Sequence, residues 1–194
     1  MVRVAEEWLN ICGGCEVTIL DIGEPLLDLL PQLQFVHMPV LMDHKYFGQT
    51  GEKTEMEIPE AEVGIISGGV RNDKEKHVAT EMRKKCQTLI SLGSCACYGG
   101  IPALANQYTL ADLYEKVYRQ SKSTDPAATP SEDLPPLTDR VYALDEVVKV
   151  DIYIPGCPTK REKKAMASVK RPLELIVPPC QTRDWLEASK SINS

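Results

Sequence analysis

Three glycine-rich segments that carry cysteine each follow directly after a short apolar stretch of this chain. The segments are 10–15, 93–100 and 155–158, and the stretches before them are 2–8, 88–92 and 147–154. Short stretches rich in Val, Ile and Leu, bounded by glycine or proline, are typical of strands. When such strands lie parallel, the turns that leave their carboxyl ends gather at one edge of the sheet. The pattern therefore predicts that cysteines far apart in the sequence lie close together in the fold.

Helical patterns alternate with these strands. Helices are expected at 16–30, with a break at Gly23 and Pro25, and behind polar caps at 74–86 and 110–119. Two more strands are expected at 34–38 and 63–67, loops at 43–60 and 121–136, and a last helix at 158–169. Strands that alternate with helices predict an α/β fold, here a flavodoxin-like parallel sheet with helices on both faces and the site at the carboxyl edge of the strands.

Length and charge narrow the class of protein. A chain of 194 residues suits one domain, expected at 1–170, with an extended, proline-rich tail at 171–194. A net charge of −6 offers no basic patch for nucleic acid. No apolar run approaches the roughly 18 residues that cross a bilayer, so membrane insertion is not expected. Because Val2–Trp8 reads at once as a strand, no signal peptide is expected, and the predicted location is the cytoplasm.

The cysteines suggest a metal or redox site. An odd count of seven cannot form a complete disulfide framework. Alone, Cys12 and Cys15 would indicate half a zinc site or a dithiol, but a dithiol does not call for Cys95 and Cys157 at other strand ends. Structural zinc sites mostly use two local pairs, whereas four convergent thiolates suit an iron–sulfur cluster. A structural zinc-binding interaction domain stays open as the alternative from another class.

Taken together, the segments 12–15, 93–100 and 155–158 resemble the small subunit of nickel–iron hydrogenases, in order and separation, over about 1–170. The resemblance implies that Cys12, Cys15, Cys95 and Cys157 hold one proximal 4Fe–4S cluster. It also implies a large partner subunit with the nickel–iron centre, and electron transfer to further iron–sulfur and flavin subunits that react with NAD. The chain would then be the electron-transferring subunit of a hydrogenase, active only with the large subunit.

The subgroup follows from shorter motifs. Segments 39–43, 67–72 and 99–103 are similar to the short cytoplasmic small subunits of NAD-linked, methyl-viologen-reducing and electron-bifurcating enzymes. Membrane-associated energy-converting hydrogenases also use this cysteine spacing and remain an alternative. The related subunit of respiratory complex I has two adjacent cysteines, unlike the pair here. Gly14 and Gly100 stand where oxygen-tolerant relatives carry extra cysteines, which implies an ordinary cluster.

Several other residues carry weaker expectations. Cys86 and Cys97 are expected to be buried fillers, and the role of Cys180 is left open. Glu16 is read as a first-turn helix acid, with cluster tuning or proton transfer as the alternative. An exposed apolar edge for the large subunit is predicted at Ile11, Val17, Tyr98, Ile101, Pro102, Ala103 and Leu104. The onward electron carrier is expected to meet segment 121–136 or the tail.

Overall fold

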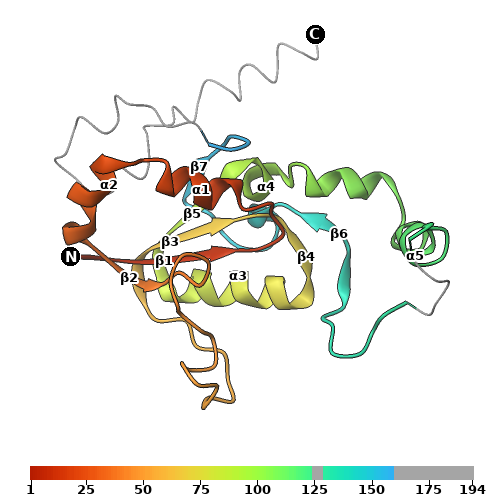
Figure 1. The fold of residues 1–194 in the computed structure, drawn as a ribbon, viewed down its shortest axis with the longest axis horizontal. Helices are drawn as coiled ribbons and strands as arrows, with labels where there is room; N and C mark the ends of the chain where they lie inside the picture. The colour runs from red at the N-terminus through yellow and green to blue at the C-terminus, as the bar shows by residue number, and fades with distance from the viewer. Residues whose placement is uncertain (124–128, 160–194) are drawn as a thin grey trace, which may run out of the picture. The chain divides into compact units, whose positions relative to one another are not determined.

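The computed structural model describes residues 1–123 and 129–159. Its centre is a five-stranded parallel sheet in the order β2-β1-β3-β5-β7 (Figure 1). The strands are β1 (Val2–Trp8), β2 (Leu33–His37), β3 (Ala61–Ser67), β5 (Cys86–Leu92) and β7 (Ile152–Ile154). Numbered along the chain this is the order 2-1-3-4-5, which is that of flavodoxin-like folds. The predicted fold class is confirmed, and the strand order reverses between β1 and β3.

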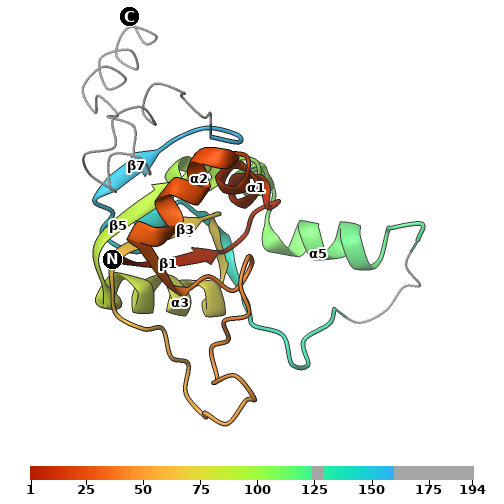
Figure 2. The ribbon, with the colours of Figure 1, turned by 60° about the vertical axis from the view of Figure 1, so that its left-hand side comes forward.

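Helices cover both faces of this sheet (Figures 1 and 2). Helices α1 (Gly14–Leu20) and α2 (Glu24–Leu29) lie on one face, and α3 (Asp73–Lys85) lies on the other. The expected break between α1 and α2 is present, because Gly23 takes a left-handed φ of 71° and Pro25 sits in the first turn of α2. The polar cap predicted for α3 is present, and it is a reciprocal capping box between Asn72 and Glu75.

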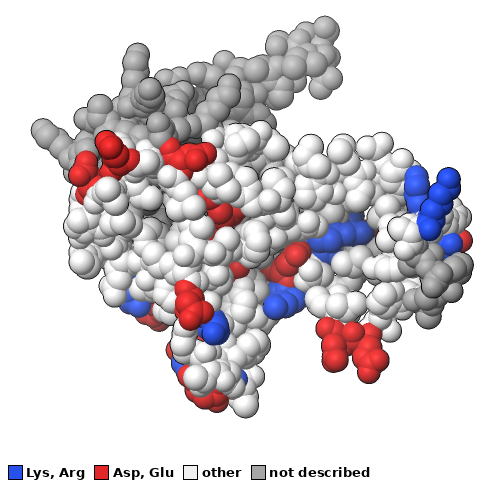
Figure 3. All heavy atoms as spheres, viewed as in Figure 1, with Lys and Arg blue, Asp and Glu red and all other residues white. Residues whose placement is uncertain are grey.

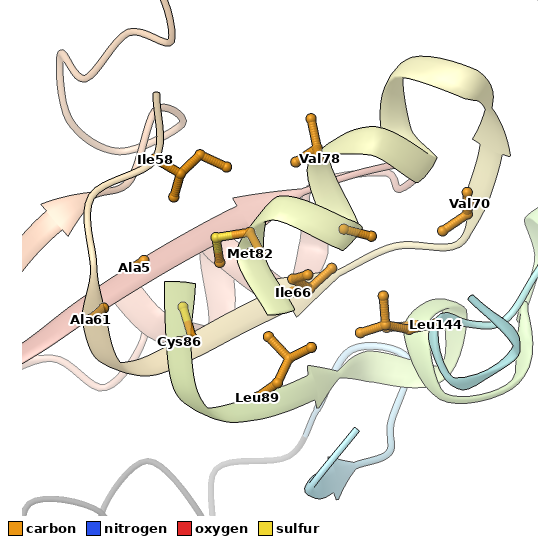
Figure 4. Packing of buried hydrophobic residues seen from close by; sticks show 12 residues of the cluster. Ala5, Ile58, Ala61, Ile66, Val70, Val78, Met82, Cys86, Leu89 and Leu144 are labelled. Carbon is orange, nitrogen blue, oxygen red and sulfur yellow. The ribbon is translucent and has the colours of Figure 1, made fainter. Parts of the chain in front are cut away.

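An apolar core cluster lies between α3 and the sheet (Figure 4). Ile66 and Leu89 come from the strands and Met82 from α3, and all three side chains are fully buried. The backbone of Gly64 approaches this layer so closely that a Cβ there would lie 2.6 Å from Cys86 Sγ. The sheet therefore needs a residue without a side chain at this point, which makes Gly64 a packing glycine.

Four local predictions were wrong or incomplete. The predicted helix at 74–86 stops at Lys85, and Cys86 begins β5 instead. The predicted strand at 147–154 is reduced to Ile152–Ile154, since Val147, Val148 and Val150 pack against the core after the 3₁₀ turn η3 (Leu144–Glu146). The expected loop 93–100 contains the short helix α4 (Gly93–Tyr98). A small antiparallel pair of β4 (Val70–Asn72) and β6 (Leu137–Tyr142) was missed.

The remaining elements are η1 (Leu30–Gln32), η2 (Pro102–Gln107) and α5 (Leu110–Tyr118), the last behind the predicted Thr109 cap. No helix in the described part of the chain is long and apolar enough to cross a membrane. The predicted helix beyond residue 159, the tail at 171–194 and Cys180 lie outside the described residues.

Candidate metal centre

All four predicted ligand cysteines lie at the carboxyl ends of strands. Cys12 and Cys15 follow β1, Cys95 lies in α4 directly after β5, and Cys157 follows β7. Their side chains lie close enough for the charge of one to shift the pKa of another. The pKa of Cys95 is raised first by burial, and negative charge on Cys157 and Cys12 adds to the effect. The pKa of Cys15 is raised to about 12 by burial, by Glu16 and by Cys95 and Cys12. The structure thus brings together the four residues that the sequence singled out.

Backbone hydrogen bonds hold the cysteine-bearing loops side by side. The amide and carbonyl of Asn10 pair with the carbonyl and amide of Gly69 at 3.0 and 3.1 Å, which joins the loop before Cys12 to the end of β3. The amide of Ser94 donates to the carbonyl of Gly156 at 2.8 Å, which joins the Cys95 and Cys157 loops. The site is therefore built on the sheet edge itself and does not depend on one long loop.

Glycine lets these backbones come close to the thiols. Gly93 has a φ of +84°, and a Cβ there would lie only 2.4 Å from Cys15 Sγ. A Cβ at Gly100 would lie 2.8 Å from the backbone of Cys95 and 3.0 Å from its Sγ. Any larger residue at these points would push into the space that the sulfurs occupy.

The donor set fits an anionic cluster. Backbone N–H groups of Thr159 and Ile101 point to the sulfurs of Cys15 and Cys95 and favour their thiolate forms. Cys15 and Cys95 are buried, while Cys12 and Cys157 are exposed. Within residues 1–123 and 129–159, no group of three or more His, Cys, Asp or Glu side chains is gathered closely enough for a single metal ion.

A pair of buried carboxyl groups lies beside this site and was not predicted. Glu16, in the first turn of α1, accepts a hydrogen bond from the Ser67 hydroxyl, and only 2% of it is exposed. Glu6 on β1 is fully buried, and its carboxyl group lies within hydrogen-bond reach of the Glu16 carboxyl group. Burial first, and then the charges of Glu16 and Glu7, raise the pKa of Glu6 to about 8. Its surroundings therefore favour the protonated form of Glu6 at neutral pH.

Glu7, the next residue after Glu6, lies on the other face of the sheet and has several hydrogen-bond partners. Successive strand side chains point to opposite faces, so Glu7 lies on the α3 face of β1. Its carboxylate accepts hydrogen bonds from the Tyr46 hydroxyl at 2.5 Å and the Trp8 amide at 3.1 Å, and His37 Nε2 lies 2.9 Å away. Burial and the charge of Glu7 raise the pKa of Tyr46. These partners anchor the loop at 43–60 to the sheet, and His37 serves a structural role there.

The remaining cysteine and surface predictions were largely correct. Cys86 and Cys97 are both buried, and the Ser91 hydroxyl lies 3.4 Å from the sulfur of Cys97. Around the cysteines, the predicted apolar edge is exposed at Val17, Tyr98, Ile101 and Leu104, to between 49 and 64%. Ile11, Pro102 and Ala103 are only partly exposed.

Comparisons with known proteins identify relatives of this chain. Residues 12–170 match the family model described as NADH ubiquinone oxidoreductase, 20 Kd subunit. The F420-non-reducing hydrogenase of Methanothermobacter marburgensis has a subunit that is 40% identical over 166 residues, which are 84% of this chain and 51% of that protein. The chain thus spans about half the length of the first curated relatives it matches.

Two further comparisons cover more of the related protein. The NAD-reducing hydrogenase HoxS subunit delta of Cupriavidus necator is 35% identical over 162 residues, or 81% of this chain and 72% of that protein. A crystal structure of an NAD⁺-reducing [NiFe]-hydrogenase in the H₂-reduced state contains a chain that superposes with a TM-score of 0.72 at 32% identity, covering 81% of this chain and 83% of that one.

Proposed function

We propose a function for this chain on the premise that it belongs to the family described as NADH ubiquinone oxidoreductase, 20 Kd subunit, and within it to the nickel–iron hydrogenase small-subunit type. The proposed function is electron transfer between the nickel–iron centre of a large subunit and a further iron–sulfur or flavin module linked to NAD. The observation that carries it is the meeting of Cys12, Cys15, Cys95 and Cys157 at the carboxyl edge of one sheet.

The four cysteines are proposed as the ligands of one 4Fe–4S cluster, which would accept and pass on one electron at a time. The chain's own residues bind it and set its surroundings. Cys15 and Cys95 hold the buried side, and the backbone amides of Thr159 and Ile101 donate to their sulfurs, which stabilises negative charge there. Gly93 and Gly100 keep the backbone close enough to exclude water from that side. The exposed Cys12 and Cys157 leave the other side for a partner to cover.

The partners and the location belong to the same proposal. The relatives named above are subunits of NAD-reducing and F420-non-reducing hydrogenases, which supports a large hydrogenase subunit as one partner. A flavin-containing NAD module is proposed as the other, in the cytoplasm, and cell fractionation tests the location. A membrane-associated energy-converting hydrogenase is the alternative partner complex, and a structural zinc domain is the alternative from another class.

The test is anaerobic purification of the tagged, full-length chain from its native cells. We expect a nickel-containing large subunit to co-purify, and the visible absorbance of the complex to bleach when H₂ replaces N₂. A Cys95→Ala variant serves as the control, because it should abolish the bleaching without changing the nickel content of the partner. A wild-type chain that carries iron but retains no nickel-containing partner, and that does not respond to H₂, would overturn the proposal.

A further inference from the structure

Helix α5 (Leu110–Tyr118) has an apolar face that the described part of the chain buries only in part. Leu110, Leu113, Tyr114, Val117 and Tyr118 recur at helical spacing along one side, and none of the nine residues of α5 is buried. Val117 is 52% exposed. Figures 1 and 2 both show α5 standing away from the five-stranded sheet.

A helix of this kind needs a partner. Isolated helices shorter than about 12 residues are marginal in water, so nine residues do not hold together by propensity alone. The capping box between Thr109 and Asp112 and the ion pair of Glu115 and Arg119 at 3.1 Å add only modest stability. Most helical stability in proteins comes from packing of the apolar face.

The segment that leads to α5 is nevertheless held firmly. In η2 (Pro102–Gln107), the Asn106 side chain accepts from the Val141 amide at 2.8 Å and donates to the Val141 carbonyl at 2.9 Å. This two-sided amide clamp joins η2 to β6. Gly99 and Ala103 pack so tightly that a Cβ at Gly99 would lie 2.6 Å from Ala103 Cβ. Specific contacts therefore hold the segment between Cys95 and α5 against the rest of the fold.

The apolar surface of α5 is continuous with the surface around Cys95. Directly after that cysteine, exposed apolar side chains follow along the chain to α5, at Tyr98, Ile101, Leu104 and Tyr108, each between 49 and 64% exposed. Figure 3 shows that the surface from α4 across η2 toward α5 carries no Lys, Arg, Asp or Glu. A partner that comes close to Cys95 to exchange electrons would cover the start of this band.

We propose that η2 and α5 form a docking arm whose apolar face binds the hydrogenase large subunit. This inference rests on the proposed function and extends its partner surface from the cysteine edge out to α5. The arm is positioned before docking by the Asn106 clamp, which lowers the entropy lost on binding. The large subunit supplies the apolar surface that the described part of the chain does not offer to the helix.

The test compares two variants of the tagged full-length chain in the purification described above. Leu113→Glu/Val117→Glu places charge on the docking face and keeps good helix formers in α5. Leu27→Glu is the matched control, because Leu27 is 65% exposed on α2, at the opposite end of the view in Figure 1. Iron per chain, circular dichroism and size-exclusion chromatography of each isolated chain report whether the variants fold.

We expect the double variant to retain its iron. Its affinity for the large subunit should fall at least about tenfold, which corresponds to about 1.4 kcal/mol of binding free energy. Leu27→Glu should retain the large subunit in full. Equal retention by the double variant would overturn the docking arm but leave the proposed function standing. Loss of iron or of helix in the isolated double variant would show that α5 packs on this chain. A wild-type dimer that becomes monomeric in the double variant would show that α5 binds a second copy of the chain. Either result would overturn the inference. A wild-type chain with no large subunit would defeat the proposed function itself.

Discussion

Replacement of Glu6 by Gln should stabilise the protein at alkaline pH and have little effect at acidic pH. Glu6 is fully buried, and its pKa is raised from 4.5 to about 8. An acid with a higher pKa in the folded than in the unfolded chain binds more protons when folded. The free energy of unfolding therefore falls as the pH rises from 4.5 to about 8 and is level above. At about 1.4 kcal/mol per pKa unit, the full effect is on the order of 5 kcal/mol.

The measurement is the urea midpoint of wild type and Glu6→Gln at about pH 5 and pH 8.5, at matched iron content. With a urea slope of about 2 kcal/mol per molar, the difference between the two proteins should grow by about 2 M between these pH values. Glu55→Gln is the control for the loss of one acidic side chain, because Glu55 is exposed. If the difference between wild type and Glu6→Gln is the same at both pH values, Glu6 is not held protonated and the reasoning is refuted.

Three further predictions concern a close contact at the site, the packing of the sheet and an ion pair. Gly93→Ala should sharply lower the iron bound per chain, because its Cβ would lie 2.4 Å from Cys15 Sγ at a φ of +84°; unchanged iron would contradict the proposed packing. Gly64→Ala should lower the free energy of unfolding by about 1–3 kcal/mol through overpacking against Cys86. Adding Cys86→Ala should restore much of that stability, and chemical denaturation measures both changes. Arg83→Met should cost about 1–2 kcal/mol at neutral pH, since it breaks a 2.5 Å pair with Asp151. The Leu89 amide and Arg83 lower the pKa of Asp151, so that cost should shrink as acid protonates Asp151, and a constant cost would contradict it.

The sheet and the meeting of the cysteines could be predicted because both follow from local patterns. Short apolar stretches indicated the strands, and Gly23 with Pro25 indicated the helix break. What failed were boundaries that tertiary packing decides. Cys86 continues a helical pattern, yet it begins β5 because its side chain packs against Gly64. The turn after β5 reads as a glycine-rich loop, although its residues close into α4.

The burial of Glu6, Glu7 and Glu16 could not be predicted from the sequence. Glu6 and Glu7 read as a charged interruption of a strand, and nothing in the residue types says that both are buried on opposite faces. Glu16 was expected in the first turn of a helix, but its contact with Ser67 joins residues 51 positions apart. Such a contact depends on the order β1-β3 in the sheet, which only the fold reveals. The ligand roles of the four cysteines remain predictions that the fold permits.

The most direct test of the central claim is iron and acid-labile sulfide per chain, with the EPR spectrum of the reduced protein, in three proteins purified without oxygen. The account predicts about four iron and four sulfide per chain in the wild type, the same values in Cys86→Ala, and a lost or converted cluster in Cys157→Ala. Full cluster content in Cys157→Ala, or zinc in place of iron in the wild type, would contradict the account.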